Sequence, residues 1–356
     1  MTLTVRLRRS ELDQPGLRRI RRGRGFSYVD ATGGPVSEAD RDRISTLVIP
    51  PAWKDVWISP HPNGHIQAVG TDDAGRRQYL YHEAWRQQKD EEKHRRVLRL
   101  ARHLPIVRRT VAARLRRPGY DRERVVAMAL RMLDAGLFRT GGEEYEQEHG
   151  SHGVATLLKE HVSLSGDTLN FRFPAKSGVE RVAQLTDPDL AKAVRSLRRA
   201  ARRGDRLLRY RVDGQWRDLQ TNEIRTEFKD LAGQEFTVKD LRTWAATVVA
   251  SVALARLMAE AGPDASEDYP GREKAAFEEV AAQLGNTPAV AKSSYVDPRV
   301  VEEHAEGRTV LPSLRRSLTK ADRRRLARGD LAMVRDRDAL DKVVLRFLER
   351  AYDSGD

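Results

Sequence analysis

The segment RRQYLYHEAWRQQKDEEKHRRVLRLARHL, residues 76–104, changes its hydrophobic period part-way along, and that change predicts the fold. Up to His82 apolar and polar side chains alternate, as in a half-buried β-strand, whereas beyond it they repeat about every 3.6 residues, as in a helix. Upstream, from about residue 17, Gly and Pro separate short alternating runs, which is typical of a small antiparallel sheet. We therefore expect an α+β protein with a β-rich amino-terminal domain over residues 1–90 and a larger, mainly α-helical domain over residues 91–356.

One short helix is expected inside the β-rich domain. Ser37 with Asp40 three residues on resembles a capping box, and the apolar residues that follow would share one helix face: Ile44, Leu47 and Val48. The sequence IPPAW, residues 49–53, would end this helix because a residue before proline disfavours helical backbone. In the larger domain, apolar side chains at helical spacing predict helices over 121–138, 187–203, 237–262, 272–285 and 340–352.

A β-hairpin is expected between the first two of these helices. The sequence TLNFRFPAKSGVERVAQL, residues 168–185, alternates, turns between Pro174 and Gly178, and alternates again. This pattern places Lys176 at the tip of a β-turn. The chain shows no internal repeat and no low-complexity tract.

The charge of the chain points to a polyanion as its partner. Its 356 residues carry a net charge of +13, while hydrophobic residues still make up 39%, enough for a buried core. Such a basic surplus is typical of proteins that bind nucleic acid. The basic residues gather in four segments, residues 18–24, 93–117, 195–209 and 315–328. Any one of them could be a solvated helix face, but four together could enclose a DNA duplex, so double-stranded DNA is the expected partner.

Several function classes are excluded by what the sequence lacks. It has no cysteine, so disulfide scaffolds, thiolate zinc sites and cysteine nucleophiles are excluded. Phosphate-binding GxxxxGK[ST] and zinc-binding HExxH motifs are absent, and the close histidine pairs in HPNGH, residues 61–65, and HGSH, residues 149–152, lack a third ligand. We therefore expect no metal and no cofactor. There is no apolar run of membrane-spanning length, so we expect a cytoplasmic protein associated with the nucleoid.

The sequence does offer the groups needed to cut a phosphodiester without a metal: a nucleophile, cations for the phosphate oxygens, and an acid for the leaving alkoxide. Tyr295 could attack phosphorus if nearby positive charge stabilised its anion. Arg139 and Arg242 could each grip two phosphate oxygens, and Lys176 could deliver a proton. Each residue also has a plainer interpretation, because Arg139 could cap a helix and Tyr295 could be a core aromatic. Spacing alone does not decide between the two.

Four motifs resemble the active-site segments of the type IB DNA topoisomerases, in their poxvirus-like bacterial branch. They are FRTGGEEY, FRFPAKSG, FTVKDLRTW and LGNTPAVAKSSYVDP, in this order along the chain. The sequences LVIPPAWKDVWISP and GHIQAVGTDDAGRRQYLYH resemble the small β-rich domain of the same family, so the resemblance covers nearly the whole chain. It implies a monomeric enzyme that closes as a clamp around duplex DNA. It also implies relaxation of supercoils by transient single-strand cleavage, independent of ATP and metal.

The resemblance assigns roles to the motif residues. Tyr295 would form a 3′-phosphotyrosyl link, Arg139 and Arg242 would bind the scissile phosphate, and Lys176 would protonate the leaving 5′ oxygen. Asn286 occupies the position, nine residues before the tyrosine, where the family usually has histidine. An amide can donate a hydrogen bond to a phosphate oxygen but cannot transfer a proton, so only the oxyanion role is retained. Thr287 as N-cap and Pro288 as first helical residue would leave this asparagine in a preceding loop.

Five further residues are expected to hold DNA, again on the strength of the resemblance. The strand with Gln78, Tyr79 and Tyr81 resembles one that faces the major groove, where a glutamine can pair with adenine; alternation would put both tyrosines on one face. Packing of an aromatic strand on its own helix is the alternative. Tyr145 resembles a phosphate-contacting tyrosine, and Lys239 a lysine near the scissile site.

Two other functions remain open at the level of sequence. A tyrosine recombinase shares the tyrosine and arginine chemistry, but its usual His-x-x-Arg signature would have Lys239 in place of the histidine. A non-enzymatic DNA-binding protein would account equally well for the basic segments. It would not require Tyr295.

Overall fold

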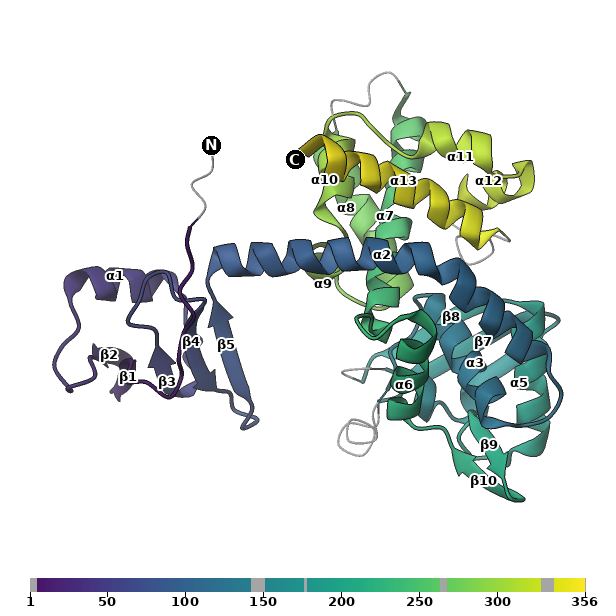
Figure 1. Ribbon diagram of the computed structural model, residues 1–356, viewed down its shortest axis with the longest axis horizontal. Coiled ribbons are helices and arrows are strands. Elements are labelled where there is room, and N and C mark those ends of the chain that lie inside the picture. Colours follow the sequence, from purple (N-terminus) through teal and green to yellow (C-terminus); the bar gives the residue numbers. More distant parts are fainter. Residues whose placement is uncertain (1–4, 142–150, 176–177, 263–267, 328–335, 356) are drawn as a thin grey trace. The chain divides into compact units, whose positions relative to one another are not determined.

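The computed structural model describes residues 5–141, 151–175, 178–262, 268–327 and 336–355. The chain divides into two compact units, Met1–His94 and Arg95–Asp356. The division falls inside helix α2 (Glu83–Arg116), the same helix in which the sequence places the boundary near residue 90. Strands dominate the first unit and helices the second (Figure 1), so the expected α+β class is confirmed.

The first unit is a five-stranded antiparallel sheet with one helix against it. Its strands are β1 (Leu17–Arg22), β2 (Gly25–Val29), β3 (Lys54–Ile58), β4 (Ile66–Thr71) and β5 (Arg77–Tyr81), in the order β2-β1-β3-β4-β5. The helix is α1 (Glu38–Thr46). A small core joins them, formed by Leu17, Val36, Ile44, Val56, Ile58 and Ala68.

The ends of α1 show where local patterning succeeds and where it fails. The Ser37 hydroxyl accepts a hydrogen bond from the backbone N–H of Asp40 at 3.1 Å, which confirms the predicted cap. Ile44 is buried, and Leu47 packs against the core. Val48, however, is 79% exposed and has a φ of 48°, so its predicted place on the apolar face is wrong. The helix ends before Val48 because the Ile-Pro-Pro sequence that follows cannot continue it.

The second unit is built from helices around two small sheets (Figure 1). After α2 its helices are α3 (Arg122–Asp134), α5 (Pro188–Ala200), α6 (Thr221–Ala232), α7 (Val238–Ala261), α8 (Tyr269–Leu284), α9 (Pro288–Ser294), α10 (Pro298–Ala305), α11 (Leu311–Ser317), α12 (Lys320–Ala327) and α13 (Arg337–Gly355). One sheet has the order β6-β7-β8, from β6 (Val162–Ser165), β7 (Thr168–Pro174) and β8 (Glu180–Thr186), and the other pairs β9 (Arg209–Val212) with β10 (Gln215–Asp218).

Helix α7 is the centre of the second unit. Its side chains from Val238 to Ala255 are buried almost without interruption. Among the described residues it is the one helix long and apolar enough to cross a membrane, but 67% of its apolar window is buried inside the unit. We therefore interpret it as a core helix.

The expected helices are present, with shifted ends. Helix α3 stops at Asp134 rather than 138 because Gly136 turns the chain with a φ of 75°. Helix α8 begins at Tyr269, ahead of the expected 272, behind an Asp268 cap. Helix α6 and the β9–β10 hairpin were not expected from the sequence, although an Asp-Gly pair at 213–214 is a known hairpin turn signal.

The expected hairpin is confirmed. Strands β7 and β8 pair from Thr168 with Thr186 to Pro174 with Glu180. The backbone N–H of Ala175 donates to Val179 O at 2.9 Å and closes the turn. Lys176 belongs to this turn by sequence, but it lies outside the described residues.

Candidate functional site

Arg242 is the most deeply buried of the candidate residues that the structure describes. It lies near the start of α7, is 4% exposed, and donates to three backbone carbonyls: Gly136 O and Phe138 O at 3.0 Å and Leu284 O at 2.8 Å. Its Nε is buried with no partner in the described part of the chain. Burial, followed by the positive charge of Arg139, lowers the pKa of Arg242 to about 10, while Tyr295 acts in the opposite direction. The guanidinium therefore stays charged at neutral pH.

Gly136 allows Arg242 to reach these carbonyls. A Cβ on this glycine would lie 2.5 Å from the Cβ of Ala245, and its φ of 75° is unfavourable for other residues. A side chain here would push the segment after α3 away from α7. The segment that bends at Gly136 also carries Arg139.

Arg139 contacts Asn286 directly. Its Nη2 donates to Asn286 Oδ1 at 2.6 Å and to Gly285 O at 3.3 Å. Because a guanidinium only donates, this contact orients the amide with its oxygen toward Arg139. The amide nitrogen, Nδ2, is buried and has no partner among the described residues, so it is a donor left available in the site.

The loop position of Asn286 is as expected. Thr287 is the N-cap of α9, its hydroxyl accepting from the N–H of Val290 at 3.3 Å, and Pro288 is the first helical residue. Asn286 therefore precedes the helix, and Tyr295 follows at the other end as its C-cap.

Tyr295 is half-buried and faces two cations. The Cζ of Arg242 lies 5.5 Å from the centre of its ring, and the Nζ of Lys239 lies 5.9 Å from it. The backbone carbonyl of Tyr295 accepts a hydrogen bond from the hydroxyl of Thr247 at 3.4 Å. That hydroxyl in turn accepts a hydrogen bond from the backbone N–H of Asp297 at 3.2 Å. The tyrosine is thereby fixed against the core helix α7.

A cleft joins Arg139, Arg242 and Tyr295. Two hollows, of about 680 Å³ and about 590 Å³, share four lining residues: Arg139, Thr140, Arg225 and Arg242. Tyr295 and Lys239 line the smaller hollow. Ala175 and Arg181, from either side of the hairpin turn, line the larger one. The side chains that line the cleft make it basic.

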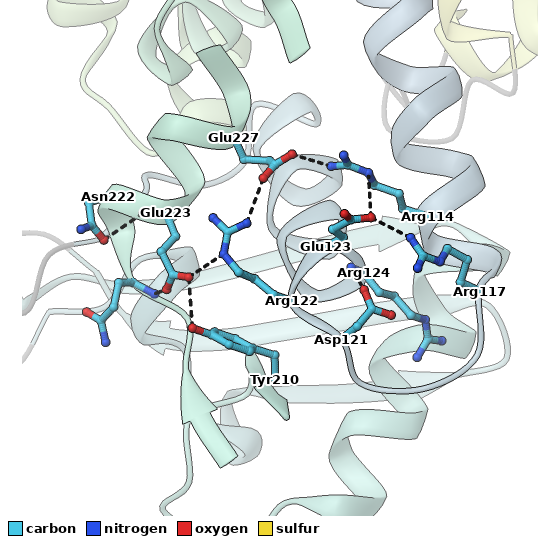
Figure 2. Close-up of polar contacts among 11 residues, drawn as sticks. Arg114, Arg117, Asp121, Arg122, Glu123, Arg124, Tyr210, Asn222, Glu223 and Glu227 are labelled. Carbon is cyan, nitrogen blue, oxygen red and sulfur yellow. Dashed lines mark hydrogen bonds and ion pairs between the residues drawn. The ribbon is translucent and has the colours of Figure 1, made fainter. Parts of the chain in front are cut away.

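Helix α6 forms another wall of the cleft, and an ion-pair network holds it in place (Figure 2). Arg122 donates through Nε to Glu223 at 2.8 Å and through Nη1 to Glu227 at 3.0 Å. Arg114 donates a hydrogen bond to Glu227 at 2.7 Å, and the hydroxyl of Tyr210 donates one to Glu223 at 3.1 Å. Because α2, α3 and β9 all hold one face of α6, its other face can present Arg225 to the cleft.

Sequence reasoning did not select Arg181 and Arg225. Neither belongs to a motif with a recognised role, and both are single residues in a chain rich in arginine. Their involvement follows from tertiary packing. Conversely, two candidates, Lys176 and Tyr145, lie outside the described residues.

The DNA-binding candidates of the first unit lie on β5. Tyr79 and Tyr81 are 38% and 39% exposed, and their rings stack with centres 6.1 Å apart, so both lie on one face as expected. Gln78 alternates to the other face, together with Leu80, which packs against the core. Its amide nitrogen donates to Asp72 at 2.9 Å. The exposed face of β5 thus presents the two tyrosines without the glutamine.

Across the described ranges, no group of three or more His, Cys, Asp or Glu side chains is arranged to hold a metal ion. The charges that surround the cleft residues named above come from arginine and lysine instead.

Comparisons with known proteins identify the family. Residues 82–311 match the family model described as "Eukaryotic DNA topoisomerase I, catalytic core", and residues 25–72 match "Bacterial DNA topoisomerase IB, N-terminal domain". The chain is also 31% identical over 287 residues to the DNA topoisomerase 1B of Acanthamoeba polyphaga mimivirus, which covers 79% of this chain and 85% of the relative. The chain belongs to the type IB DNA topoisomerases. It is therefore an isomerase that acts on DNA, and the expected family is confirmed.

The two matches follow the two units of this topoisomerase. The catalytic-core match includes Arg139, Arg242, Asn286 and Tyr295. The amino-terminal match lies wholly within the first unit. The cleft described above is therefore in the catalytic part of a type IB topoisomerase.

Proposed function

We propose that this topoisomerase relaxes supercoiled DNA by cutting one strand and rejoining it through a covalent link between Tyr295 and a 3′-phosphate. The observation that supports it best is the convergence of the cleft residues. Arg139, Arg242 and the segment with Asn286 and Tyr295 are far apart in the sequence, yet direct contacts or a shared cleft join them.

In this mechanism the Tyr295 oxygen attacks phosphorus, its proton passes to solvent water, and the P–O5′ bond breaks as the 5′ oxygen gains a proton. The duplex rotates around the intact strand, and the 5′-hydroxyl then attacks the phosphotyrosine to restore the original bond. Because the phosphotyrosyl ester conserves the energy of the cleaved bond, the cycle requires no ATP. Fixed guanidiniums can stabilise the charge that develops on the phosphate oxygens, so we expect activity without a divalent metal.

Each candidate catalytic residue has its own part in this mechanism. Arg242 and Arg139 bind the scissile phosphate, and Lys239 adds positive charge beside the Tyr295 ring. Lys176, carried on the hairpin turn, supplies the proton to the 5′ oxygen. Asn286 donates its unpaired Nδ2 to a non-bridging oxygen, and the contact from Arg139 to Oδ1 holds the amide in that orientation.

DNA binding is shared between the two units in this proposal. Tyr79 and Tyr81 contact the duplex through the exposed face of β5, and Gln78 takes part once its amide leaves Asp72. Tyr145 contacts a phosphate. The enzyme acts as a monomer that closes on duplex DNA in the cytoplasm, at the nucleoid. Recombination between four bound copies is disfavoured because Lys239 stands where a recombinase has histidine.

The test is relaxation of a supercoiled plasmid in EDTA without ATP. Wild type is expected to relax the plasmid, and Tyr295→Phe to lose covalent attachment to DNA altogether. Tyr120→Phe is the matched control, because Tyr120 is a half-buried tyrosine of the same unit that contacts Ser196 at 3.2 Å, outside the cleft. Full activity of Tyr295→Phe, or an inactive wild type, would reject the mechanism.

A further inference from the structure

The carboxyl end of α8 gathers three guanidiniums. The last carbonyls of a helix lack intrahelical donors and carry partial negative charge, so they attract cations. Here four successive carbonyls accept from arginines of three different segments: Ala282 and Gln283 from Arg181, Leu284 from Arg242, and Gly285 from Arg139. Two of these arginines are the proposed phosphate ligands. The third, Arg181, has no role in the mechanism above.

The geometry of Arg181 is that of a fixed contact. Its Nη1 donates to Ala282 O at 2.6 Å, and its Nη2 donates to Gln283 O. A Cβ placed on Gly285 would lie 3.3 Å from the guanidinium carbon, so the side chain packs closely against the backbone just before Asn286. Burial, with the positive charge of Arg139 as the smaller cause, lowers the pKa of Arg181. The Arg181 guanidinium is held here despite its burial and the nearby charge of Arg139 because the partial negative charge at the end of α8 attracts it.

Arg181 connects two segments that are far apart in the sequence. It lies on β8, opposite Phe173 of β7, five residues after Lys176. Its acceptors are 101 and 102 residues further along the chain, on the helix that leads into Asn286 and Tyr295. The hairpin with the proposed acid is thereby attached to the segment with the nucleophile.

We propose that Arg181 is a positioning residue that clamps the β7–β8 hairpin to the end of α8. By this contact it sets the place of the leaving-group acid relative to Tyr295 and the scissile phosphate. The inference rests on the proposed function and deepens it. A misplacement of about 1 Å can cost about 100-fold in rate, so loss of the clamp is expected to slow cleavage by about 10-fold to 100-fold.

The experiment compares two leaving groups under single-turnover conditions, on a duplex whose cleavage site has been mapped with wild type. One duplex has the normal 5′ oxygen at the scissile bond and the other has sulfur there. A thiol has a pKa near 8.5 and a hydroxyl one far higher, so a thiolate leaves without a proton from an acid. A defect in proton delivery is therefore seen with oxygen and relieved with sulfur.

Arg181→Gln is expected to cleave the oxygen duplex about 10-fold to 100-fold more slowly and the sulfur duplex at nearly the wild-type rate, as Lys176→Ala should. Arg181→Lys keeps the charge but lacks the planar guanidinium that can donate to two carbonyls at once. It should therefore slow cleavage of the oxygen duplex less, and it should again cleave the sulfur duplex at nearly the wild-type rate. The double variant Arg181→Gln/Lys176→Ala should be no slower than Lys176→Ala alone, because both changes affect one step.

The matched control is Arg172→Gln. Arg172 lies on β7 of the same hairpin and contacts Glu180 at 2.8 Å, but it does not line the cleft. It should cleave both duplexes at the wild-type rate. Thermal melting identifies any variant that has lost its fold, and Arg181→Lys then provides the test.

Three outcomes would overturn the inference. Arg181→Gln could cleave like wild type, or it could be slowed equally on oxygen and sulfur, as expected if Arg181 serves only the stability of α8 or the placement of Asn286. A double variant far slower than Lys176→Ala would also contradict it. An inactive wild type, or cleavage by Tyr295→Phe, would instead overturn the proposed function and this inference with it.

Discussion

The β5 strand of the first unit and the cleft of the second unit present their functional candidates in opposite ways. On β5, Tyr79 and Tyr81 are neighbours on one strand, exposed and stacked on each other. In the cleft, Arg139 and Asn286 are 147 residues apart in sequence and touch at 2.6 Å, and Arg242 is 4% exposed. A surface that holds DNA can be built from adjacent exposed residues, whereas charges that stabilise a transition state must be buried and fixed from several sides.

The largest effect of a single cation is expected at Arg242. A lysine has one ammonium and cannot satisfy three carbonyls and a phosphate together, so Arg242→Lys should lower the single-turnover cleavage rate by about 10² to 10³-fold. Arg256→Lys, on the same helix but paired with Glu260 at 2.9 Å, is the control and should cleave normally. If both variants cleaved at wild-type rates, the proposed catalytic role of the buried Arg242 guanidinium would be wrong.

Asn286 tests whether the cleft needs a proton at this position. Asn286→Ala removes the unpaired Nδ2 donor and should slow cleavage by about 10-fold to 100-fold. Asn286→His restores a donor and should change the rate less than tenfold, with a new pH dependence near the ordinary histidine pKa of about 6.5. A rate gain well beyond tenfold in Asn286→His would show that proton transfer is missing from the native site.

A smaller effect, on binding alone, is expected on β5. Tyr79→Ala should weaken DNA binding by about 1 kcal/mol, about fivefold in Kd, and leave the cleavage rate at saturating DNA unchanged. Fluorescence anisotropy in a Tyr295→Phe background measures binding without cleavage. Val48→Ala, which removes an exposed apolar side chain elsewhere in the first unit, should bind like wild type. A lower cleavage rate of Tyr79→Ala at saturating DNA would contradict the assignment of β5 to binding and of the cleft to catalysis.

The smallest effect is expected at Asp72, beside β5. Hydrogen bonds from Arg76 and Gln78 lower the pKa of Asp72 to about 2. Because the pKa is depressed in the folded state, the stabilisation is present above the ordinary pKa near 4 and is lost as the pH falls toward 2. The Asp72→Asn variant should therefore melt slightly lower than wild type at pH 7 and like it at pH 2. An equal difference at both pH values would contradict this assignment.

Local sequence patterns predicted the elements of this protein well. The change of period at His82, the Ser37 cap and the 168–185 hairpin all depend on neighbouring residues, and all are present. The errors have local causes too: Gly136 ended α3 early, and Ile-Pro-Pro ended α1 before Val48. Helix α6 was missed because its N-cap residue, Gln220, is not one of the residues that usually signal a helix start, and its side chain makes no cap hydrogen bond.

The sequence by itself determined the class of fold and the family, because periodicity, caps and motifs are carried by residues close together in the chain. It also named the candidates Tyr295, Arg139 and Arg242, through motifs rather than through chemistry. Only the tertiary structure decided which groups meet. The contacts of Arg181 with the end of α8 span about a hundred residues, and no local pattern encodes a distance of that kind, since it depends on how every intervening element packs.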